Sequence, residues 1–464
     1  MLQATEYDLG DYLAWFHRAP NIAHVERRGH LVLTAKARLL LGLAWFIVAT
    51  SLVSALGAAL RGLTGSGLAW FLLTAAILAL LPLLAAYLLA IPLWLGEQIV
   101  QKPRAKAIIA RAATTLANHP ARRIAIAGSY GKTTAKEILL SVLSAGRTVA
   151  ATPGNMNTPL GISRFASRLT GKEDILILEL GEYYPGDIRE LCELTKPHLG
   201  VITGINEAHL SKFKTLEATT ATIFELADYL GEAPVYKNGE NALVAARARS
   251  DDPLLYTRAG VNGWKVSAIE IAIDHTSFTA RRGSTTIRAR SGLLGAHNLG
   301  PLVAAIDIAT ELGLTPTQIE AGLADTKPYE HRMQPRLQHG ATIVDDTYNG
   351  NVDGVRAGLD WLAAVPATRR VYITPGLVEQ GNRTAQVHEA IGGLIAAALT
   401  SPTDLVVLMR NTTTPHVEKG LQEAKFAGRL QIVDDPLKFY SNLEQFVAAG
   451  DVVLMQNDWT DNYS

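Results

Sequence analysis

This sequence has very little cysteine and no net charge. Its 464 residues include a single cysteine, Cys192, which excludes an intramolecular disulfide framework and a zinc site built on cysteines. The 43 Lys and Arg residues equal the 43 Asp and Glu residues, so the chain has no basic surplus with which a general nucleic-acid-binding protein would neutralise phosphates. The length allows roughly two to four domains.

Charged residues are scarce as well, at 19% of the chain against roughly 25% in an ordinary soluble protein. They are absent from residues 39–60 and 62–96. At about 1.5 Å per residue, a helix over either run is long enough to cross a hydrocarbon core of about 30 Å. A buried core helix is usually shorter, and a cleaved signal peptide is not followed by a second long apolar segment. The sequence therefore predicts a transmembrane helical hairpin over residues 36–97.

Basic residues flank this hairpin on both sides. They are Arg27, Arg28, Lys36 and Arg38 before it, and Lys102, Arg104, Lys106 and Arg111 after it. By the positive-inside rule both flanks are cytoplasmic, and the short connection at 61–67 faces outward. We therefore expect a two-pass protein of the cytoplasmic membrane, with residues 1–35 as an N-terminal cytoplasmic segment and the large C-terminal part in the cytoplasm.

A phosphate-binding loop is predicted after a basic linker helix at 98–120. An apolar run at 123–127 leads into a glycine loop and then into a helical pattern. This arrangement presents backbone N–H groups, a lysine and a hydroxyl to a bound phosphate and its magnesium ion. The loop has the shortened form of the motif, with Ile126 where the full Walker spacing has glycine; a plain strand-to-helix turn is the alternative. The expected nucleotide-binding residues are Gly128, Ser129, Tyr130, Gly131, Lys132, Thr133 and Thr134.

The shortened loop resembles the ATP loop of the Mur ligase family of cell-wall amide ligases, and other motifs follow in that family's order. Glu179 ends an apolar strand at 175–179, and His209 follows another strand. In the family, residues at these two positions help to hold magnesium. The resemblance thus implies ATP and Mg²⁺ as cofactors, with Lys132, Glu179 and His209 as catalytic residues and Thr133, Glu179 and His209 as metal ligands.

Later motifs resemble those that surround the adenine and ribose of ATP in this family. They contribute Asn238, His297, Asn298, Arg332 and Asp346. The candidate residues on the substrate side are Asn155, Asn157, Thr158, Tyr348, Asn349 and Glu379. For Glu379, which lies in a turn-rich loop after a strand, a plain strand-to-helix connection is an equal alternative. The string Asp-Asp-Thr-Tyr-Asn at 345–349 is most similar to the branch that adds D-alanyl-D-alanine.

Two departures from the family pattern bear on the chemistry. In many relatives a lysine at the position of Ile223 is carbamylated and supports a second magnesium ion. Either Glu225 supplies this negative charge, or the enzyme holds one metal well, or the true match lies one helical turn away. The membrane hairpin also stands in place of the family's UDP-binding domain. We therefore expect either a lipid-linked acceptor or a protein partner that supplies substrate recognition.

The predicted fold class is α/β. A P-loop central domain spans 121–331 and contains a small antiparallel insertion at 264–290. A Rossmann-like C-terminal domain spans 332–464, where apolar strands alternate with helices. This second domain lacks the Gly-x-Gly-x-x-Gly fingerprint, so a dinucleotide cofactor is not expected.

The favoured function is a membrane-anchored, ATP-dependent amide ligase of cell-envelope precursor synthesis. It would join a muropeptide carboxylate to an amino acid or dipeptide amine, D-alanyl-D-alanine above others, through an acyl phosphate. The alternative is a membrane-tethered P-loop ATPase or kinase that regulates polysaccharide assembly. Its disadvantage is the short outer loop, because such regulators usually carry a large domain there. A catalytically weakened relative is a third hypothesis, kept open by Ile223.

Overall fold

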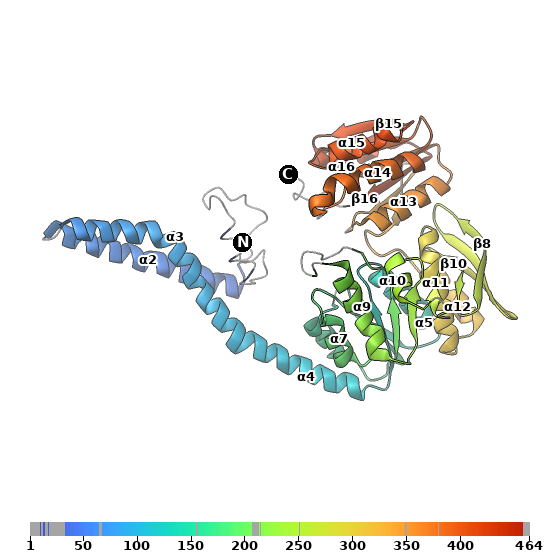
Figure 1. Cartoon of the computed structure of the whole chain (residues 1–464), viewed down its shortest axis with the longest axis horizontal. Helices are drawn as coiled ribbons and strands as arrows, with labels where there is room; N and C mark the ends of the chain where they lie inside the picture. Colours follow the sequence, from blue (N-terminus) through green and yellow to red (C-terminus); the bar gives the residue numbers. More distant parts are fainter. Residues whose placement is uncertain are drawn as a thin grey trace. The chain divides into compact units, whose positions relative to one another are not determined.

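The computed structural model describes residues 33–64, 67–154, 156–206, 215–249, 251–348, 350–378 and 380–457, together with Gly10, Leu13, His17 and Phe213. The chain divides into two compact units, Met1–Ala110 and Arg111–Ser464. Both are drawn in Figure 1.

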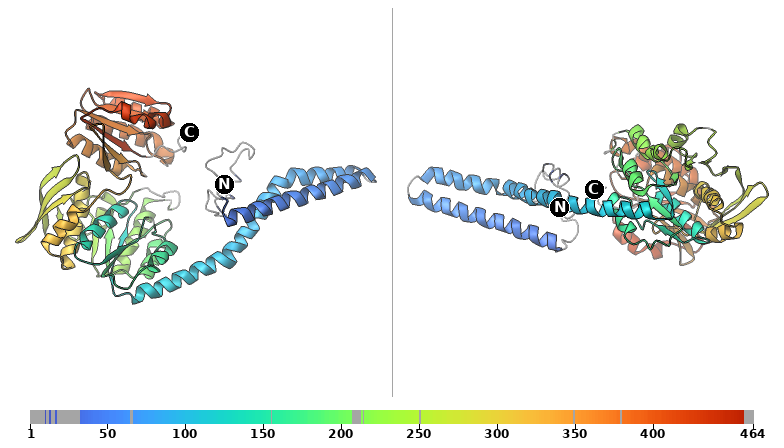
Figure 2. Two further views of the ribbon diagram at one scale, coloured as in Figure 1. Left: turned by 180° about the vertical axis from the view of Figure 1, so that it is seen from behind. Right: turned by 90° about the horizontal axis from the view of Figure 1, so that it is seen from below.

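The first unit is built from two long helices, α2 (Ala35–Thr64) and α3 (Gly67–Gly96). They lie side by side in both views of Figure 2, and the Thr74 hydroxyl of α3 donates to the Ala55 carbonyl of α2 at 3.3 Å. Within the described residues, one stretch is long and apolar enough to cross a membrane, Ala37–Arg61 in α2; α3 contributes a shorter apolar stretch, Gly67–Leu80. Of the two predicted spans, one therefore meets this criterion.

A five-residue π-helical turn, η2 (Glu97–Gln101), and the helix α4 (Lys102–Asn118) follow α3 without an intervening loop. The exposed residues of α4 include all four of its basic side chains. In the second unit, Ala112 and Leu116 of α4 are buried. The basic helix predicted over 98–120 is therefore present.

A parallel sheet of six strands forms the centre of the second unit, in the order β2-β3-β1-β4-β5-β6. The strands β1, β3 and β4 are short runs of aliphatic residues buried on both faces, which is the pattern of a sheet covered by helices on both sides. The six strands are β1 (Arg122–Ala127), β2 (Val149–Ala151), β3 (Ile175–Glu179), β4 (Leu199–Ile202), β5 (Val235–Asn238) and β6 (Leu255–Tyr256).

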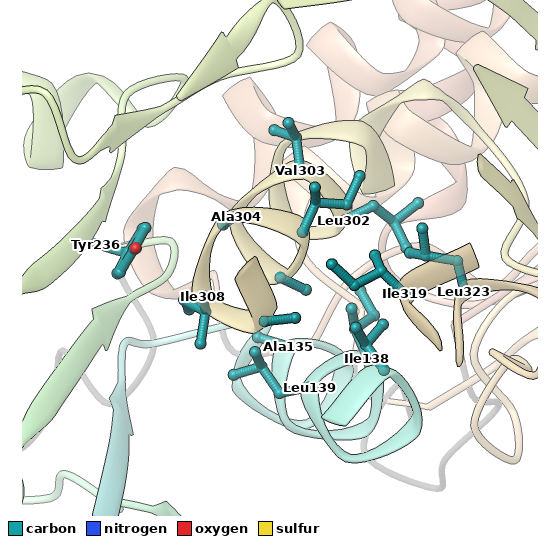
Figure 3. Close-up of a cluster of buried hydrophobic side chains, with 14 of the residues drawn as sticks. Ala135, Ile138, Leu139, Tyr236, Leu302, Val303, Ala304, Ile308, Ile319 and Leu323 are labelled. Carbon is teal, nitrogen blue, oxygen red and sulfur yellow. The ribbon is translucent and has the colours of Figure 1, made fainter. Parts of the chain in front are cut away.

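Helices cover both faces of this sheet. One face packs against α5 (Lys132–Ser144) and α11 (Leu299–Glu311), and α12 (Pro316–Ala324) packs on α5; the other face packs against α7 (Asp187–Thr195) and α9 (Leu216–Leu230). Figure 3 shows the apolar side chains of α5 facing those of α11 and α12. Two short helices, α6 (Pro159–Ala166) and α10 (Ala242–Arg247), and the 3₁₀ turn η3 (Ala296–Asn298) complete this part. The helix that begins at the phosphate loop is thus fixed from behind by a continuous core.

The predicted insertion is an antiparallel sheet in the order β10-β9-β8-β7. Its strands are β7 (Gly260–Val261), β8 (Trp264–Ile271), β9 (Thr276–Arg282) and β10 (Thr285–Ser291). The fully buried Asp307 of α11 accepts hydrogen bonds from Tyr236, Asn262, Trp264 and Arg282. One carboxylate therefore joins this sheet to the central one.

The C-terminal part has a second sheet of six strands, in the order β11-β12-β16-β13-β14-β15. All neighbours are parallel except β11, which pairs antiparallel with β12. The strands are β11 (Gln334–Gln338), β12 (Ala341–Asp346), β13 (Arg369–Thr374), β14 (Leu405–Met409), β15 (Arg429–Val433) and β16 (Asp451–Gln456). The Rossmann-like arrangement predicted for this part is present, and β11 is a strand that the prediction did not contain.

Five helices and one 3₁₀ turn accompany this sheet. They are α13 (Val352–Ala364), η4 (Gly381–Arg383), α14 (Thr384–Ala398), α15 (Thr414–Glu423), α16 (Pro436–Ser441) and α17 (Leu443–Phe446). One face of the sheet packs against α13, α14 and α15, and the other against α16 and α17.

Candidate nucleotide-binding site

The phosphate loop, residues 128–134, connects β1 to α5. Its backbone requires glycine at two positions: Gly128 has φ +148° and a Cβ there would lie 2.1 Å from the Thr203 hydroxyl, while Gly131 has φ +80° at the N-cap of α5. Strand β1 lies between β3 and β4 in the sheet. The loop therefore lies at the point where the strand order reverses, which is where open α/β sheets bind ligands.

Contacts with the end of β4 hold the loop in place. The backbone N–H groups of Ser129 and Tyr130 donate to the Gly204 carbonyl at 2.8 and 3.2 Å, and the Thr203 hydroxyl donates to the Tyr130 carbonyl at 2.6 Å. The Ser129 hydroxyl oxygen is buried and has no hydrogen-bond partner among the described residues. The loop is thus fixed against the end of β4 and holds a buried polar atom that the described residues leave without a hydrogen bond.

Lys132, the lysine of the loop, is paired with a buried carboxylate. Its Nζ lies 2.8 Å from Oε2 of Glu182 and also donates to the Gly128 carbonyl. The Glu182 side chain is 2% exposed. Burial raises the pKa of Glu182, and the neighbouring Lys132 opposes that rise.

Glu179, at the end of β3, accepts three side-chain hydrogen bonds or ion pairs. Thr133 Oγ1 and Lys136 Nζ approach its Oε2 at 3.2 and 3.1 Å, and Asn157 Nδ2 approaches its Oε1 at 3.3 Å. Lys136 is completely buried, and its Nζ also donates to the Gly154 carbonyl at 3.0 Å. This lysine therefore connects α5, the end of β3 and the loop at 152–158.

A cavity of about 440 Å³ lies beside the phosphate loop, between the central and C-terminal sheets of the second unit. The loop contributes Tyr130, Gly131 and Thr134 to its lining. Predicted adenine- and ribose-side residues line it as well: Asn238, His297, Asn298, Arg332 and Asp346. These residues come from positions more than a hundred apart in the sequence, so the fold brings the separate motifs to one place.

Three polar groups on the far side of the cavity have unusual environments. His297 is buried and near Arg258, which lowers its pKa to about 4, so its ring is neutral at pH 7. Burial raises the pKa of Asp346 to about 6, although its carboxylate accepts from Gln456 at 2.8 Å. His297 Nδ1 and Arg332 Nε are buried atoms without a hydrogen-bond partner in the described part of the chain.

Two family models match the second unit. The Mur ligase middle domain matches residues 126–309, and the Mur ligase, glutamate ligase domain matches residues 331–456. A curated relative, the UDP-N-acetylmuramoyl-tripeptide–D-alanyl-D-alanine ligase of Mycobacterium leprae, is 30% identical over 366 residues, which are 72% of this chain and 70% of the relative. The chain belongs to the Mur ligase family.

The chain is also similar to a second curated ligase and to a solved structure. The ligase of the same description from Mycobacterium tuberculosis is 32% identical over 316 residues, covering 66% of this chain and 62% of the relative. The crystal structure of MurF ligase from Thermotoga maritima in complex with ADP has a TM-score of 0.63 and 25% identity, over 76% of this chain and 80% of that one. This Mur ligase thus spans less than two thirds of the M. tuberculosis relative.

The predicted cofactors, ATP and Mg²⁺, are those that Mur ligases use. The site fits a nucleotide, because Ser129, His297 and Arg332 each hold a buried polar atom with no partner among the described residues. Within those residues, no cluster of three or more His, Cys, Asp or Glu side chains that could hold a metal occurs. Thr133 and Glu179 are oxygen donors, and Mg²⁺ commonly takes one or two carboxylates together with phosphate oxygens.

The structure places the other predicted residues of this Mur ligase in different surroundings. Asn157 contacts Glu179, as described above, and Tyr348 lines the cavity with its ring 4.6 Å from the Arg332 guanidinium carbon. Thr158 is the N-cap of α6 and accepts from the Gly161 N–H at 3.2 Å. Four predicted residues lie outside the described residues: Asn155, His209, Asn349 and Glu379.

The structure shows the surroundings of Ile223, which stands where many relatives have the carbamylated lysine. Ile223 is completely buried in α9. Glu225, the suggested substitute, accepts from the backbone N–H groups of Gly186 and Arg189 at 3.0 and 2.9 Å, at the N-terminus of α7. Glu225 is therefore occupied in capping a helix, and the proposal that it supplies the missing charge at the metal site is not supported.

Two functional candidates were missed by the sequence analysis, Lys136 and Glu182. Lys136 follows Lys132 by four positions, so both lie on one face of α5, and this spacing is a signal that the helical pattern contained. Glu182 follows Glu179 in the segment after β3, and its pairing with Lys132 depends on how that segment folds. No local pattern indicates such a pairing.

Proposed function

We propose that this Mur ligase is an ATP-dependent amide ligase of peptidoglycan precursor synthesis. It joins the terminal carboxylate of a muropeptide to the amine of a dipeptide, D-alanyl-D-alanine above others. The observation that carries the proposal is the single cavity lined by the phosphate loop on one side and by Arg332 and Asp346 on the other. The relatives from M. tuberculosis and M. leprae are named as ligases that use D-alanyl-D-alanine.

The residues of the chain perform positioning and charge neutralisation in this reaction. ATP, when bound, supplies the phosphoryl group that converts the acceptor carboxylate into an acyl phosphate open to attack by the amine. Lys132, now paired with Glu182, would bind the phosphate oxygens, and Thr133 with Glu179 would hold the magnesium ion. His297, neutral at pH 7, accepts from the Asn298 amide at its Nε2, so its Nδ1, which has no partner among the described residues, carries the proton that it can donate to the base or the ribose.

The C-terminal domain contributes the other wall. Arg332 and Asp346 lie on the same side of the cavity, with Asp353 of α13 near Tyr130 of the phosphate loop. Closing two domains over a nucleotide excludes water, and water would otherwise hydrolyse an activated carboxylate. We infer that the cavity between the sheets performs this function.

Anchoring in the cytoplasmic membrane is a second part of the proposal. The apolar stretch Ala37–Arg61 would be about 37 Å long as a helix, more than the roughly 30 Å of a hydrocarbon core. Its large apolar side chains are exposed, Trp45 at 67% and Val53 at 70%. Exposing an apolar patch of this size to water is unfavourable. With α3 as the returning helix, the catalytic domains lie at the cytoplasmic face, where a lipid-linked acceptor is concentrated.

A mass-spectrometric assay tests the ligase activity. Purified full-length protein in detergent receives ATP, Mg²⁺, D-alanyl-D-alanine and either a UDP-linked or a lipid-linked muropeptide. We expect the acceptor to gain the mass of the dipeptide minus water, with ADP released in equal amount. Lys132→Ala should show no added mass. ATP hydrolysis that is independent of both substrates, or phosphorylation of a protein, would instead indicate the regulatory ATPase or kinase.

The anchoring is tested with engineered cysteines, for which the chain offers a clean background. The one natural cysteine, Cys192, is buried, and burial raises its thiol pKa to about 12, so it reacts slowly with maleimides. Thr64→Cys should react with an impermeant maleimide in intact cells, and Ala107→Cys of α4 only after lysis. Labelling of both sites in intact cells, or a protein that remains in the supernatant after ultracentrifugation, would reject the two-pass anchor.

A further inference from the structure

A carboxylate inside the protein competes with a bound nucleotide for the lysine of the phosphate loop. Lys132 Nζ lies 2.8 Å from the Glu182 carboxylate, and the two side chains are 12% and 2% exposed. Neither charge is well solvated, so each depends on the other. A nucleotide whose phosphates bind Lys132 must therefore take the lysine from Glu182.

The second buried lysine of the site is not free to replace the first. Lys136 is held by Glu179 Oε2 at 3.1 Å and by the Gly154 carbonyl at 3.0 Å. The two lysines and the two carboxylates thus form two ion pairs with no net charge. Glu182 and Glu179 are also close enough to repel each other, and this repulsion adds to the burial that raises the pKa of Glu182.

Phosphates that bind without a metal ion would upset the charge balance of these two ion pairs. They bring negative charge beside Glu179 and withdraw Lys132 from Glu182, so a buried carboxylate is left with no cation. A divalent cation that arrives with the phosphates supplies positive charge at the same place. Thr133 donates to Glu179 at 3.2 Å, and Glu179 is close enough to Glu182 to repel it, so a cation held by Thr133 and Glu179 would offset the charge of both carboxylates.

We propose that Glu182 is a specificity-determining residue that makes nucleotide binding depend on the divalent cation. It holds Lys132 when no nucleotide is bound, and it releases the lysine only when a metal ion compensates the buried carboxylate that is left unpaired. The enzyme then accepts Mg-nucleotide and discriminates against free nucleotide. The inference rests on the proposed nucleotide-binding role of the phosphate loop and does not depend on which amide is formed.

The experiment measures ADP binding by calorimetry to the full chain in detergent, with Mg²⁺ and with EDTA. For wild type we expect removal of the metal to weaken ADP binding by about tenfold or more, a coupling within the usual range. Glu182→Gln should strengthen metal-free ADP binding by about tenfold and reduce the metal dependence accordingly. An unchanged or weaker metal-free affinity in this variant refutes the proposal.

Two controls separate competition for Lys132 from a general loss of negative charge. Glu137→Gln removes a carboxylate that lines the cavity beside the phosphate loop, but whose nearest lysine contact is 3.8 Å, to Lys136. It should change metal-free binding much less than Glu182→Gln does. In a Lys132→Met background, Glu182→Gln should bring no gain, because no lysine remains to be released. An equal gain in either control overturns the mechanism.

A folding defect in the glutamine variant is covered by a second substitution at the same position. Glu182→Asp keeps the charge but shortens the side chain by one methylene group, so it should hold Lys132 less well and give an intermediate metal-free affinity. Thermal unfolding of each variant identifies the folded ones. A folded Asp variant that binds metal-free ADP as wild type does contradicts the proposal. Failure of the ligase assay alone leaves these binding results unaffected, so the two proposals are tested separately.

Discussion

Replacing Lys136 by methionine tests whether the buried charges of the site support one another. The methionine side chain has nearly the same length and fills the same space, but it carries no charge and no donor. The variant leaves Glu179, which is 4% exposed, with hydrogen bonds from Thr133 and Asn157 but without its cation. It also leaves the Gly154 carbonyl without its lysine donor.

The expected loss is large for a single substitution. Removing one partner of a buried ion pair costs about 3–5 kcal/mol, because the remaining charge stays desolvated. In a domain of about 150–250 residues, 1 kcal/mol shifts the Tm by about 2–4 °C, so the transition of the central domain should fall by roughly 6–20 °C. Differential scanning calorimetry of the full chain in detergent measures this shift.

The matched control is Lys237→Met in the same domain. Lys237 pairs with Asp252 at 2.7 Å, but both side chains are more exposed, at 16% and 17%, so water replaces the lost partner more readily. We expect a loss of about 1 kcal/mol. The double variant Lys136→Met with Glu179→Gln should be more stable than the Lys136 variant alone, because no unpaired buried charge remains. Equal Tm losses for the Lys136 and Lys237 variants would refute the reasoning.

Three further predictions concern single positions. For Asp346, the folded pKa of about 6 exceeds the unfolded value of 3.8, so its contribution to stability is complete below pH 3.8 and is lost as the pH rises through 6. Between pH 4 and 7, wild type should thus lose about 3 kcal/mol relative to Asp346→Asn in urea unfolding, and parallel pH profiles would contradict this. Gly128→Ala should abolish ADP binding in calorimetry, because its Cβ would lie 2.1 Å from the Thr203 hydroxyl, and Thr203→Ala should restore part of it. Glu225→Gln should lower the free energy of unfolding by about 1 kcal/mol, because it weakens the cap of α7. The Mg²⁺ dependence of ADP binding should stay unchanged. An altered metal dependence would show that Glu225 acts at the metal site.

Local patterns predicted the elements that carry the site. The apolar run before Gly128 and the helical pattern after Lys132 suffice for a strand, a loop and a helix, because each depends on neighbouring residues only. The order of the motifs also predicted that His297 and Arg332 would serve one ligand, and both line the cavity. The resemblance, and not their spacing, made that prediction possible.

Strand β11 shows where local patterns fail. Its sequence, Gln334-Pro-Arg-Leu-Gln338, has no apolar alternation, and its residues are mostly exposed. It forms because it lies at the edge of the sheet and pairs antiparallel with β12, an environment in which polar residues and a proline are tolerated. Long-range pairing decided this element.

The ion pairs of the site were beyond prediction for a related reason. The partners of Lys132 and Lys136 depend on which carboxylate each side chain reaches after β3 and the following segment have folded. Glu179 and Glu182 are three residues apart, and nothing in the sequence assigns one to each lysine. The exchange of partners proposed for Glu182 therefore became visible only in the folded protein.

The position of β16 determines when the cavity is completed during synthesis. This strand is the last of its sheet in chain order, but it lies between β12 and β13 in the middle. Its Gln456 donates to Asp346 on the cavity wall at 2.8 Å. On the ribosome, the C-terminal sheet therefore stays divided until residues 451–456 have emerged, well after the phosphate loop. A nascent chain stalled before that point would carry a formed central domain and an incomplete partner domain, a state that exposes the strand edges of β12 and β13 to chaperones.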